Sequence, residues 1–357
     1  MKKMRKLLLP FSLLYWLVSA VRNWFFDIGF LKSEKVGAPV ISVGNISAGG
    51  VGKTPFIELL IDTITPFGRL SVVSRGYGRK SAGTVVVSDG CGKIDSVENS
   101  GDEPVQLALK FPKLIVVVDE QRVRGACKAI ELGAEVILLD DGFQHRYLHR
   151  DLDIVLLTSK EILKGDLLLP AGNRREPWNS LNRADLIVIT RCADEQEYEK
   201  AVTIGCARQL LPKEKPIVGV KTKVKTFKQY STKEVMNADL LKGKTAVAFS
   251  GIGNPASFDE ILNSAHIQVL KHIVFSDHRW YRESDIQRLG DIKIQTHADF
   301  LITTEKDAVK LRNKFEDFLK SVSIVVVEIQ QEFIPGNIKI DDLFRRLKET
   351  GGNVEQK

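Results

Sequence analysis

Short apolar runs alternate with longer segments of helical spacing along most of this chain. From Gly37 onward these runs are rich in Val and Ile, and Gly, Pro and polar residues bound them. This alternation is typical of an α/β fold with a parallel sheet. The first set of predicted strands is 40–43, 70–74, 114–118, 136–139, 154–157 and 186–190. The predicted helices of the same part are 55–64, 103–109, 122–131 and 195–209.

The pattern changes after Pro212. Residues 217–224 alternate between apolar and polar, which predicts a linker strand. A second α/β unit follows, with predicted strands at 245–249, 272–274, 300–303 and 324–327. The polar tail from Glu349 is expected to be loosely held. We therefore divide the chain into an N-terminal helix (1–31), a core domain (32–212), a linker (213–226) and a smaller C-terminal α/β domain (227–357).

The N-terminal helix is apolar over most of its circumference. Residues 7–21 contain only two serines among apolar side chains, and this run is shorter than the ~20 residues that a membrane-spanning helix needs. On a helix the polar side chains gather on one arc, and they are Ser12, Tyr15, Ser19, Arg22, Asn23 and Asp27. We therefore expect a membrane-anchoring helix that lies in the lipid interface with its broad apolar face in the bilayer.

Two other readings of this segment fit less well. A secretory signal also has a basic start and small residues, here near Ser19 and Ala20, but export would take a nucleotide site out of the cytosol. A spanning helix with the body of the protein inside would place four positive charges outside, against the usual topology. Those charges are Lys2, Lys3, Arg5 and Lys6.

The composition and charge of the chain restrict the classes of partner that it could bind. At 357 residues the chain has room for about two domains with cores of their own. The formal net charge is +7, and its N-terminal cluster suits an anionic lipid surface or substrate, whereas a nucleic-acid partner would need a longer basic stripe with aromatics. The 4 cysteines lack Cys-x-x-Cys spacing, so we expect reduced thiols of a cytosolic protein. No nucleic-acid partner is expected, and no obligate protein partner is evident.

Residues 44–55, Gly-Asn-Ile-Ser-Ala-Gly-Gly-Val-Gly-Lys-Thr-Pro, carry the strongest chemical signal. They join a predicted strand to a predicted helix, where backbone N–H groups and a helix N-terminus form a phosphate site. Lys53 would contact the outer phosphates of a nucleoside triphosphate, and the Thr54 hydroxyl would ligate Mg²⁺. The P-loop pattern has a glycine where Ser47 stands. The predicted nucleotide-binding residues are Gly49, Gly50, Val51, Gly52, Lys53 and Thr54.

A predicted strand at 136–139 ends in Asp140 and Asp141. In P-loop proteins a carboxylate at such a strand end holds Mg²⁺, directly or through water. Both acids are therefore predicted metal ligands together with Thr54, and the sequence leaves open which acid contacts the ion. The fold class expected is a P-loop NTPase-type parallel sheet core with a second, smaller α/β domain and an N-terminal membrane-associated helix.

The motifs and their order resemble those of the tetraacyldisaccharide 4'-kinases, the lipid A 4'-kinases of Gram-negative bacteria. In that family a non-glycine at the position of Ser47 is usual. The blocks that resemble the family are GNISAGGVGKTP (44–55), SRGYG (74–78), GDEP (101–104), DDGFQHR (140–146), SGIGNP (250–255), FSDH (275–278) and TTEKDAVK (303–310). They follow the family order over nearly the whole chain, including the N-terminal anchor. One block departs, because Asn173-Arg174 stands where Pro-Leu is commoner, while Arg175 and Glu176 still align.

The resemblance implies a lipid kinase that uses ATP and Mg²⁺. It would transfer the γ-phosphate of ATP to the 4'-hydroxyl of a tetraacylated glucosamine disaccharide 1-phosphate in lipid A (lipopolysaccharide) biosynthesis. Its partners would be this acylated disaccharide lipid and the inner-membrane lipid surface. The location implied is the cytoplasmic face of a bacterial inner membrane, with a peripheral or monotopic attachment. The smaller domain would act as a lid over the kinase core.

A sugar hydroxyl is a poor nucleophile, so a side chain must take its proton as the new bond forms. The resemblance points to Asp102 and His278 as a pair in which the acid orients the imidazole. Lys53 and Arg175 are the further predicted catalytic residues. Nothing in the sequence alone places Asp102 and His278 in contact. By default His278 is a structural or surface imidazole and Asp102 is a helix N-cap.

The predicted substrate-binding residues are Arg75, Arg122, Gln144, His145 and Glu176. The arginines follow candidate strands or lie in loops, where phosphates bind in open α/β sheets. A guanidinium binds phosphate through two hydrogen bonds, which suits either the γ-phosphoryl group or the lipid 1-phosphate. Taken singly, each is by default a solvated surface arginine.

Other classes of nucleotide-binding protein match less completely. Partner-activated ATPases that position cell-division or plasmid machinery share the Gly-Gly-Val-Gly-Lys-Thr core but carry a further lysine where Ala48 stands, and this class is the main alternative. A GTPase would have Asp at the position of Leu139, and residues 304–307 place the lysine of its Asn-Lys-x-Asp motif one position late. A non-enzymatic membrane scaffold would not need an intact glycine segment and acid pair.

Overall fold

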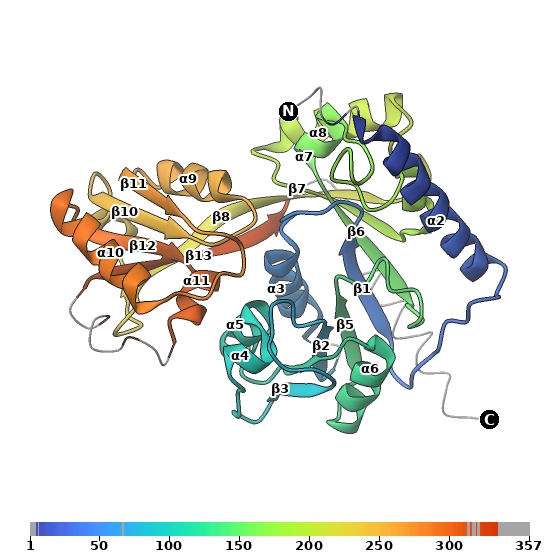
Figure 1. Cartoon of the computed structure of the whole chain (residues 1–357), viewed down its shortest axis with the longest axis horizontal. Helices are drawn as coiled ribbons and strands as arrows, with labels where there is room; N and C mark the ends of the chain where they lie inside the picture. Colours follow the sequence, from blue (N-terminus) through green and yellow to red (C-terminus); the bar gives the residue numbers. More distant parts are fainter. Residues whose placement is uncertain are drawn as a thin grey trace.

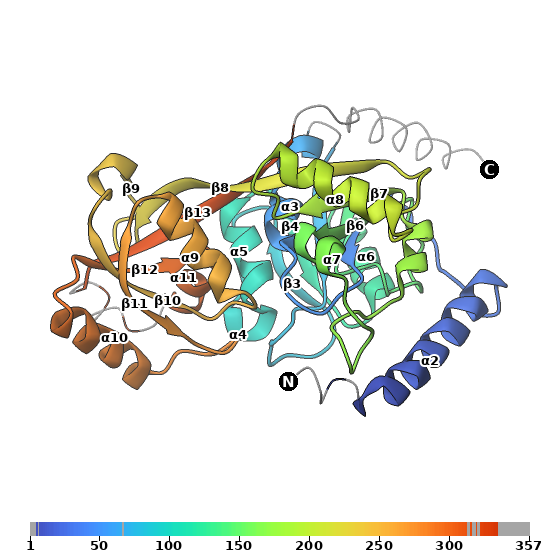
Figure 2. The same cartoon turned by 90° about the horizontal axis from the view of Figure 1, so that it is seen from above.

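The computed structural model describes residues 5, 7–65, 68–312, 315, 319 and 322–334. Three members of the N-terminal basic cluster (Lys2, Lys3 and Lys6) and the tail from Glu349 lie outside the described residues. Figures 1 and 2 show a larger lobe with strands β1–β7 and a smaller lobe with strands β9–β12. Two long strands, β8 and β13, run between the lobes (Figure 1).

The described strands form one 13-stranded mixed sheet in the order β11-β10-β12-β13-β8-β7-β6-β1-β5-β2-β4-β3, with β9 paired to β8. Most neighbours are parallel, and the antiparallel pairs are β3 with β4, β8 with β9, and β8 with β13. The strands are β1 (Val40–Asn45), β2 (Leu70–Ser74), β3 (Val85–Asp89), β4 (Ile115–Val118), β5 (Val136–Asp140), β6 (Leu152–Thr158), β7 (Leu186–Thr190), β8 (Ile217–Gln229), β9 (Val235–Met236), β10 (Thr245–Ser250), β11 (Gln268–Val274), β12 (Phe300–Thr304) and β13 (Ile324–Phe333).

Helices cover the sheet and lead into the loops at its edge. The α-helices are α2 (Leu9–Asp27), α3 (Lys53–Ile64), α4 (Val97–Ser100), α5 (Asp102–Lys110), α6 (Arg122–Glu131), α7 (Ser159–Lys164), α8 (Glu195–Ala207), α9 (Pro255–Ser264), α10 (Glu283–Gln295) and α11 (Glu305–Lys310). Two 3₁₀ helices are η2 (Trp178–Arg183) and η3 (Ala238–Leu240).

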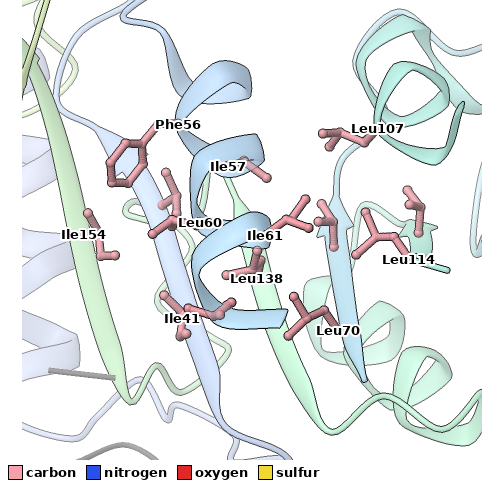
Figure 3. Close-up of a cluster of buried hydrophobic side chains, with 14 of the residues drawn as sticks. Ile41, Phe56, Ile57, Leu60, Ile61, Leu70, Leu107, Leu114, Leu138 and Ile154 are labelled. Carbon is pink, nitrogen blue, oxygen red and sulfur yellow. The ribbon is translucent and has the colours of Figure 1, made fainter. Parts of the chain in front are cut away.

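The apolar runs read from the sequence are strands buried on both faces. Val72 and Leu138 belong to the apolar cluster beneath α3, whereas their neighbours Val73 and Leu139 belong to the cluster beneath α6. Successive side chains of a strand point to opposite faces, so a sheet with helices on both sides requires continuous apolar runs. Figure 3 shows the first of these clusters packed between the strands, α3 and α5.

The predicted strands of both lobes coincide with observed strands; the bounds of β2 and β7 are as predicted, and the ends of the other strands differ. The largest difference is in β13, which continues from the predicted end at Val327 to Phe333. Its first residues pair with β12, and its last residues pair with β8 near the larger lobe. The sequence missed this extension because the residues after Val327 are largely polar. It also missed the strands β3 and β9 and the helices α4, α7, α9, α10 and α11.

β8 and β13 together form the connection between the lobes. β8 begins parallel to β7 at Ile217 and pairs antiparallel with β13 from Val220 onward. The ring of Phe333 at the end of β13 lies 6.3 Å from that of Phe56 in α3. The connection is therefore a two-stranded ribbon, whereas the sequence predicted a single linker strand and ended the second strand at Val327. The division into domains at 213–226 stays a prediction.

Helix α2 lies along the larger lobe, away from the smaller one (Figure 2). Its polar arc faces the protein, since the Ser12 hydroxyl donates to Leu168 O (3.0 Å) and the Tyr15 hydroxyl donates to Arg175 O (3.0 Å). Its outer face exposes large apolar side chains, namely Leu9, Phe11, Leu13, Leu14, Trp16, Leu17, Val18, Val21 and Trp24. Among the helices formed by the described residues, none has the length and apolar character to span a bilayer.

The lobes also meet at a buried group of charges. Lys110 of α5 places its Nζ 2.8 Å from Glu58 Oε2 in α3 and 3.0 Å from Glu305 Oε1 in α11. One ammonium thus serves two carboxylates from different lobes. Burial, and then the charge of Glu58, raise the pKa of Glu305 to about 7.

The raised pKa of Glu305 predicts a pH-dependent stability. A carboxyl group with a higher pKa in the folded state favours folding at pH values below its unfolded pKa, and this contribution is lost as pH rises through about 7. Between pH 5 and pH 8 we expect the free energy of unfolding of the wild type to fall by on the order of 2 kcal/mol because of Glu305. We expect this fall to be absent in Glu305→Gln. Chemical unfolding across this range measures it. Glu131→Gln, at a surface pair with Lys128, is the control. The same dependence of the free energy of unfolding on pH in wild type and Glu305→Gln would contradict the prediction.

Candidate active site

The glycine segment, residues 44–54, links β1 to α3 at the carboxyl edge of the sheet. Gly49 and Gly52 have φ of 126° and 88°, values that a side chain disfavours, and Gly52 is the residue that caps α3. Lys53 begins the helix, and its Nζ lies 3.1 Å from Asn45 Oδ1 and 3.1 Å from Asp141 Oδ1. The lysine is thus held at the mouth of the loop by polar partners.

Contacts from both lobes hold the glycine segment in place. The Thr190 hydroxyl at the end of β7 donates to Val51 O (2.7 Å), and the guanidinium of Arg191 donates to Gly50 O. A Cβ on Gly253, in the smaller lobe, would lie 3.5 Å from Gly50 N. The SGIGNP block of the smaller lobe therefore comes close to the segment that the sequence assigned to phosphate binding.

The two acids at the end of β5, Asp140 and Asp141, have different surroundings. Arg175 donates to both oxygens of Asp141 (2.9 and 3.0 Å), and Lys53 lies 3.1 Å from it. Burial opposes ionisation of Asp141, but the hydrogen bonds from Arg175 and the charge of Lys53 outweigh it and lower its pKa well below the usual value. Asp140 Oδ1 is buried with no hydrogen-bond partner among the described residues. Burial, and then the charge of Glu103, raise the pKa of Asp140 to about 7.

Asp102 and His278 meet across the boundary between the lobes. Asp102 is the first residue of α5, and His278 follows β11 in the smaller lobe. His278 Nδ1 lies 3.1 Å from each carboxylate oxygen of Asp102. Burial would raise the pKa of Asp102, but the hydrogen bond with His278 and the charges of Lys306 and Lys310 outweigh it and lower this pKa to about 2. The helix N-cap is Gly101, not Asp102.

The backbone of His278 has a conformation that non-glycine residues adopt infrequently. Its φ of 56° lies in the left-handed region, which a side chain occupies at a cost on the order of 1 kcal/mol. The neighbouring rings of Tyr77 and His278 are 4.8 Å apart. A small pocket adjoins the pair, lined by Tyr77, Gly101, Asp102, His278, Trp280 and Lys310. Strain of this kind is retained where the surrounding structure requires one side-chain position.

The predicted substrate-binding residues occupy two different settings. Arg122 is only 5% exposed, and its Nε has no partner among the described residues, while Arg75 is exposed. Burial and the nearby positive charge of Arg122 lower the pKa of His145 to about 4. These groups form an electropositive region suited to an anion. Gln144 and Glu176 instead bond to each other (2.9 Å).

Glu176 connects helix α2 to the larger lobe. Its Oε2 accepts hydrogen bonds from Asn23 of α2 (3.2 Å) and from Arg183 (2.9 Å). Only 3% of Glu176 is exposed. In this structure the residue therefore orders the contact between α2 and the larger lobe, and its predicted contact with substrate stays a prediction.

Sequence reasoning assigned no role to three residues at this site. Asn45 accepts hydrogen bonds from Lys53 and Arg175, and Glu103 accepts one from Thr54 (3.2 Å). Lys306 contacts Glu103 from the other lobe (2.8 Å). The available signal was their position inside the motif blocks, since Asn45 and Glu103 adjoin residues that were singled out. Charge complementarity between remote segments gives no sequence signal.

Comparison with known proteins shows the family of this chain. A family model described as "Tetraacyldisaccharide-1-P 4'-kinase" matches residues 4–347. The chain belongs to this family. The tetraacyldisaccharide 4'-kinase of Aquifex aeolicus is 41% identical over 315 residues, which are 87% of this chain and 90% of that protein. The one of Chlorobium luteolum is 36% identical over 355 residues, which are 97% and 98% of the two chains.

A solved structure of the tetraacyldisaccharide 4'-kinase family has the same architecture. The crystal structure described as the "apo" form of LpxK from Aquifex aeolicus in complex with ATP is similar with a TM-score of 0.75 and 35% identity, and covers 98% of this chain and 99% of that chain. The family expected from the motifs is thus confirmed, and so is an α/β fold with a large, mixed, mostly parallel sheet.

Proposed function

We propose that this chain transfers the γ-phosphate of ATP to the 4'-hydroxyl of a tetraacylated disaccharide 1-phosphate at the site between the lobes. The names of its relatives and its family support this activity. The observation that carries the proposal is the contact of His278, from the smaller lobe, with Asp102, beside the glycine segment of the larger lobe. Glu103, next to Asp102, accepts a hydrogen bond from Thr54 of the glycine segment, so proton abstraction and nucleotide binding would take place at adjoining positions.

The residues around the glycine segment would bind MgATP. Backbone N–H groups of residues 49–53 and the N-terminus of α3 suit the phosphates, and Lys53 suits the outer phosphoryl oxygens. The buried, unpartnered Oδ1 of Asp140 and the hydroxyl of Thr54 fit a Mg²⁺ ion, whereas Asp141 is already engaged by Arg175 and Lys53. We therefore assign the metal contact to Asp140. The ion, when bound, neutralises charge on the phosphates.

His278 would act as the general base. Its Nδ1 is held by Asp102, which leaves Nε2 to accept the proton of the 4'-hydroxyl. The hydroxyl oxygen forms the new bond to the γ-phosphorus, the bond from this phosphorus to the bridging oxygen breaks, and ADP leaves with that electron pair. Asp102, ionised because its pKa is about 2, stabilises the imidazolium that results. The smaller domain acts as the lid that brings His278 to this position.

The electropositive region around Arg75, Arg122 and neutral His145 would receive an anionic part of the substrates, either the transferring phosphoryl group or the lipid 1-phosphate. Arg175, which bridges Asn45 and Asp141, is placed to position the glycine segment and the acids relative to each other. Gln144 donates to Asn45 O (2.9 Å) and supports the same loop.

One assay tests the proposed function. The full chain is incubated with Mg²⁺, ATP labelled at the γ-phosphate and detergent-dispersed tetraacylated disaccharide 1-phosphate. Label on the glycolipid is the expected result. Label released only as inorganic phosphate would overturn the kinase assignment and would favour the partner-activated ATPase class.

Helix α2 would hold the enzyme at the cytoplasmic face of the inner membrane, where an acylated substrate resides. Its polar arc is bonded to the larger lobe, so the apolar side chains are left facing outward. This is the reverse of a helix that packs on a protein core, and it suits insertion into the lipid interface.

We expect substitutions on the exposed face of α2 to have a large effect on membrane binding. Leu13 and Leu17 are 65% and 52% exposed. Burying each in lipid contributes roughly 1.5–3 kcal/mol, so the double replacement by serine is expected to lower vesicle partitioning at least ~30-fold. Vesicle flotation measures it. Replacing Val235 and Leu240 by serine is the control, because these are 68% and 70% exposed in the smaller lobe. Equal losses in the two variants would contradict the role of α2.

A further inference from the structure

Lys306 of α11 contacts three carboxylates at the boundary between the lobes. Its Nζ lies 2.8 Å from Glu103 Oε1, 3.1 Å from Asp277 Oδ1 and 3.9 Å from Asp102 Oδ2. Only 15% of the lysine side chain is exposed. Glu103 and Asp102 open α5 in the larger lobe, and Asp277 directly precedes His278. One ammonium thus bridges the acid side and the imidazole side of the proposed catalytic pair.

These carboxylates would repel one another without a cation between them. Asp277, Asp102 and Glu103 all lie within 3.9 Å of the Lys306 ammonium, and like charges this close together at a partly buried site oppose such an arrangement. Burial would lower the pKa of Lys306, but Glu103, Asp102 and Asp277 outweigh it and raise this pKa above its usual value, so the ammonium stays charged. Lys306 therefore supplies positive charge that offsets the repulsion among these carboxylates.

The contacts of Lys306 also reach the nucleotide side. Glu103 Oε1 accepts from Lys306, and its other oxygen accepts from the hydroxyl of Thr54 (3.2 Å). A single chain of polar contacts thus runs from the glycine segment through Glu103 and Lys306 to Asp277, next to His278.

Lys310, one turn later on the same helix, has a different set of partners. Its Nζ is bonded to Gly251 O (3.2 Å) and Asp307 (3.0 Å) within the smaller lobe and lies 3.5 Å from Asp102. Lys310 can therefore serve the internal packing of its own lobe. Lys306 differs because its hydrogen-bond partners are Glu103 of the larger lobe and Asp277 beside His278, which a purely internal role does not require.

We propose that Lys306 is a positioning residue for phosphoryl transfer. Its bonds to Glu103 (2.8 Å) and Asp277 (3.1 Å) fix the residues next to Asp102 and His278, so that His278 Nδ1 meets the Asp102 carboxylate. This inference rests on the proposed function, since it concerns the same site and the same catalytic pair.

The test uses the full chain and the glycolipid labelling assay. Lys306→Met is expected to lower kcat by ~10–100-fold, because small displacements of catalytic groups have effects of this size, with KM for ATP changed less than ~3-fold. Lys306→Arg, which keeps the charge, is expected to recover most of the activity. The control is Lys242→Met in the same lobe, since Lys242 forms only a surface pair with Asp239 (2.7 Å). It is expected to retain the wild-type rate.

A second comparison, made in the His278→Ala variant, distinguishes a positioning role of Lys306 from general damage to the structure. In His278→Ala, the further change Lys306→Met is expected to lower the remaining rate less than ~3-fold, because Lys306 acts through His278. An equal loss in both backgrounds, or a wild-type rate in Lys306→Met, would overturn the inference. If Lys306→Met lowers the unfolding midpoint, Lys306→Gln provides the same comparison. Failure of wild type itself to label the glycolipid would instead count against the proposed function.

Discussion

Lys53→Ala is expected to lower turnover at least ~100-fold, equivalent to about 2.7 kcal/mol of barrier. The ammonium of Lys53 lies between Asn45 and Asp141 at the mouth of the glycine segment, where the outer phosphates of ATP would bind. Alanine removes a charge that stabilises the transferring phosphoryl group and leaves Asp141 paired with Arg175 alone. Initial rates of label transfer at saturating ATP and glycolipid measure the effect.

The control for Lys53 is Lys128→Ala. Lys128 forms a surface pair with Glu131 (2.8 Å) on α6 and is expected to be dispensable. Turnover of Lys53→Ala close to that of wild type would refute the assigned role, provided that Lys128→Ala is active in the same assay.

Asp102→Ala and His278→Ala are each expected to lower kcat by ~10²–10⁴-fold, the usual contribution of a general base. The two residues share one proton-transfer task through the contact of Nδ1 with the carboxylate (3.1 Å). The double variant is therefore expected to be within ~3-fold of the slower single variant. Single-turnover rates, measured with enzyme in excess over labelled ATP, report the chemical step.

Losses that multiply in the double variant would show that Asp102 and His278 act separately. The pKa of Asp102 supplies a further check. Because this pKa is about 2, the carboxylate stays ionised above about pH 4, so Asp102 should contribute no acid limb to kcat between pH 5 and pH 8. Asp102→Asn, which removes the charge and keeps the shape, is expected to be slow throughout that range.

Much of the fold followed from local pattern. The apolar runs that became β5 and β7 were recognisable because a strand between two helical layers must be apolar on both faces. Helix α6 was predicted with its observed bounds, Arg122–Glu131. The course of β13 after Val327 was not recognisable, because its polar residues are stabilised by pairing with β8 and not by a buried face.

The candidate site likewise has features that the sequence predicted and features that only the structure shows. The glycine segment and the acid pair are contiguous, so their spacing alone indicated phosphate and metal chemistry. The sequence left the two acids equivalent. The structure distinguishes them, because Arg175 engages Asp141 while Asp140 Oδ1 has no partner among the described residues.

The sequence by itself determined the alternation of strands and helices, the location of the nucleotide-binding signal and the polar arc of α2, since each depends on residues close together in the chain. Only the tertiary structure decided that His278 meets Asp102, 176 residues away, and that Lys306 lies among the acids around them. Such contacts depend on how β8 and β13 carry the chain between the lobes. The physical reason is that no periodicity or spacing along the chain encodes a charge contact between segments this far apart.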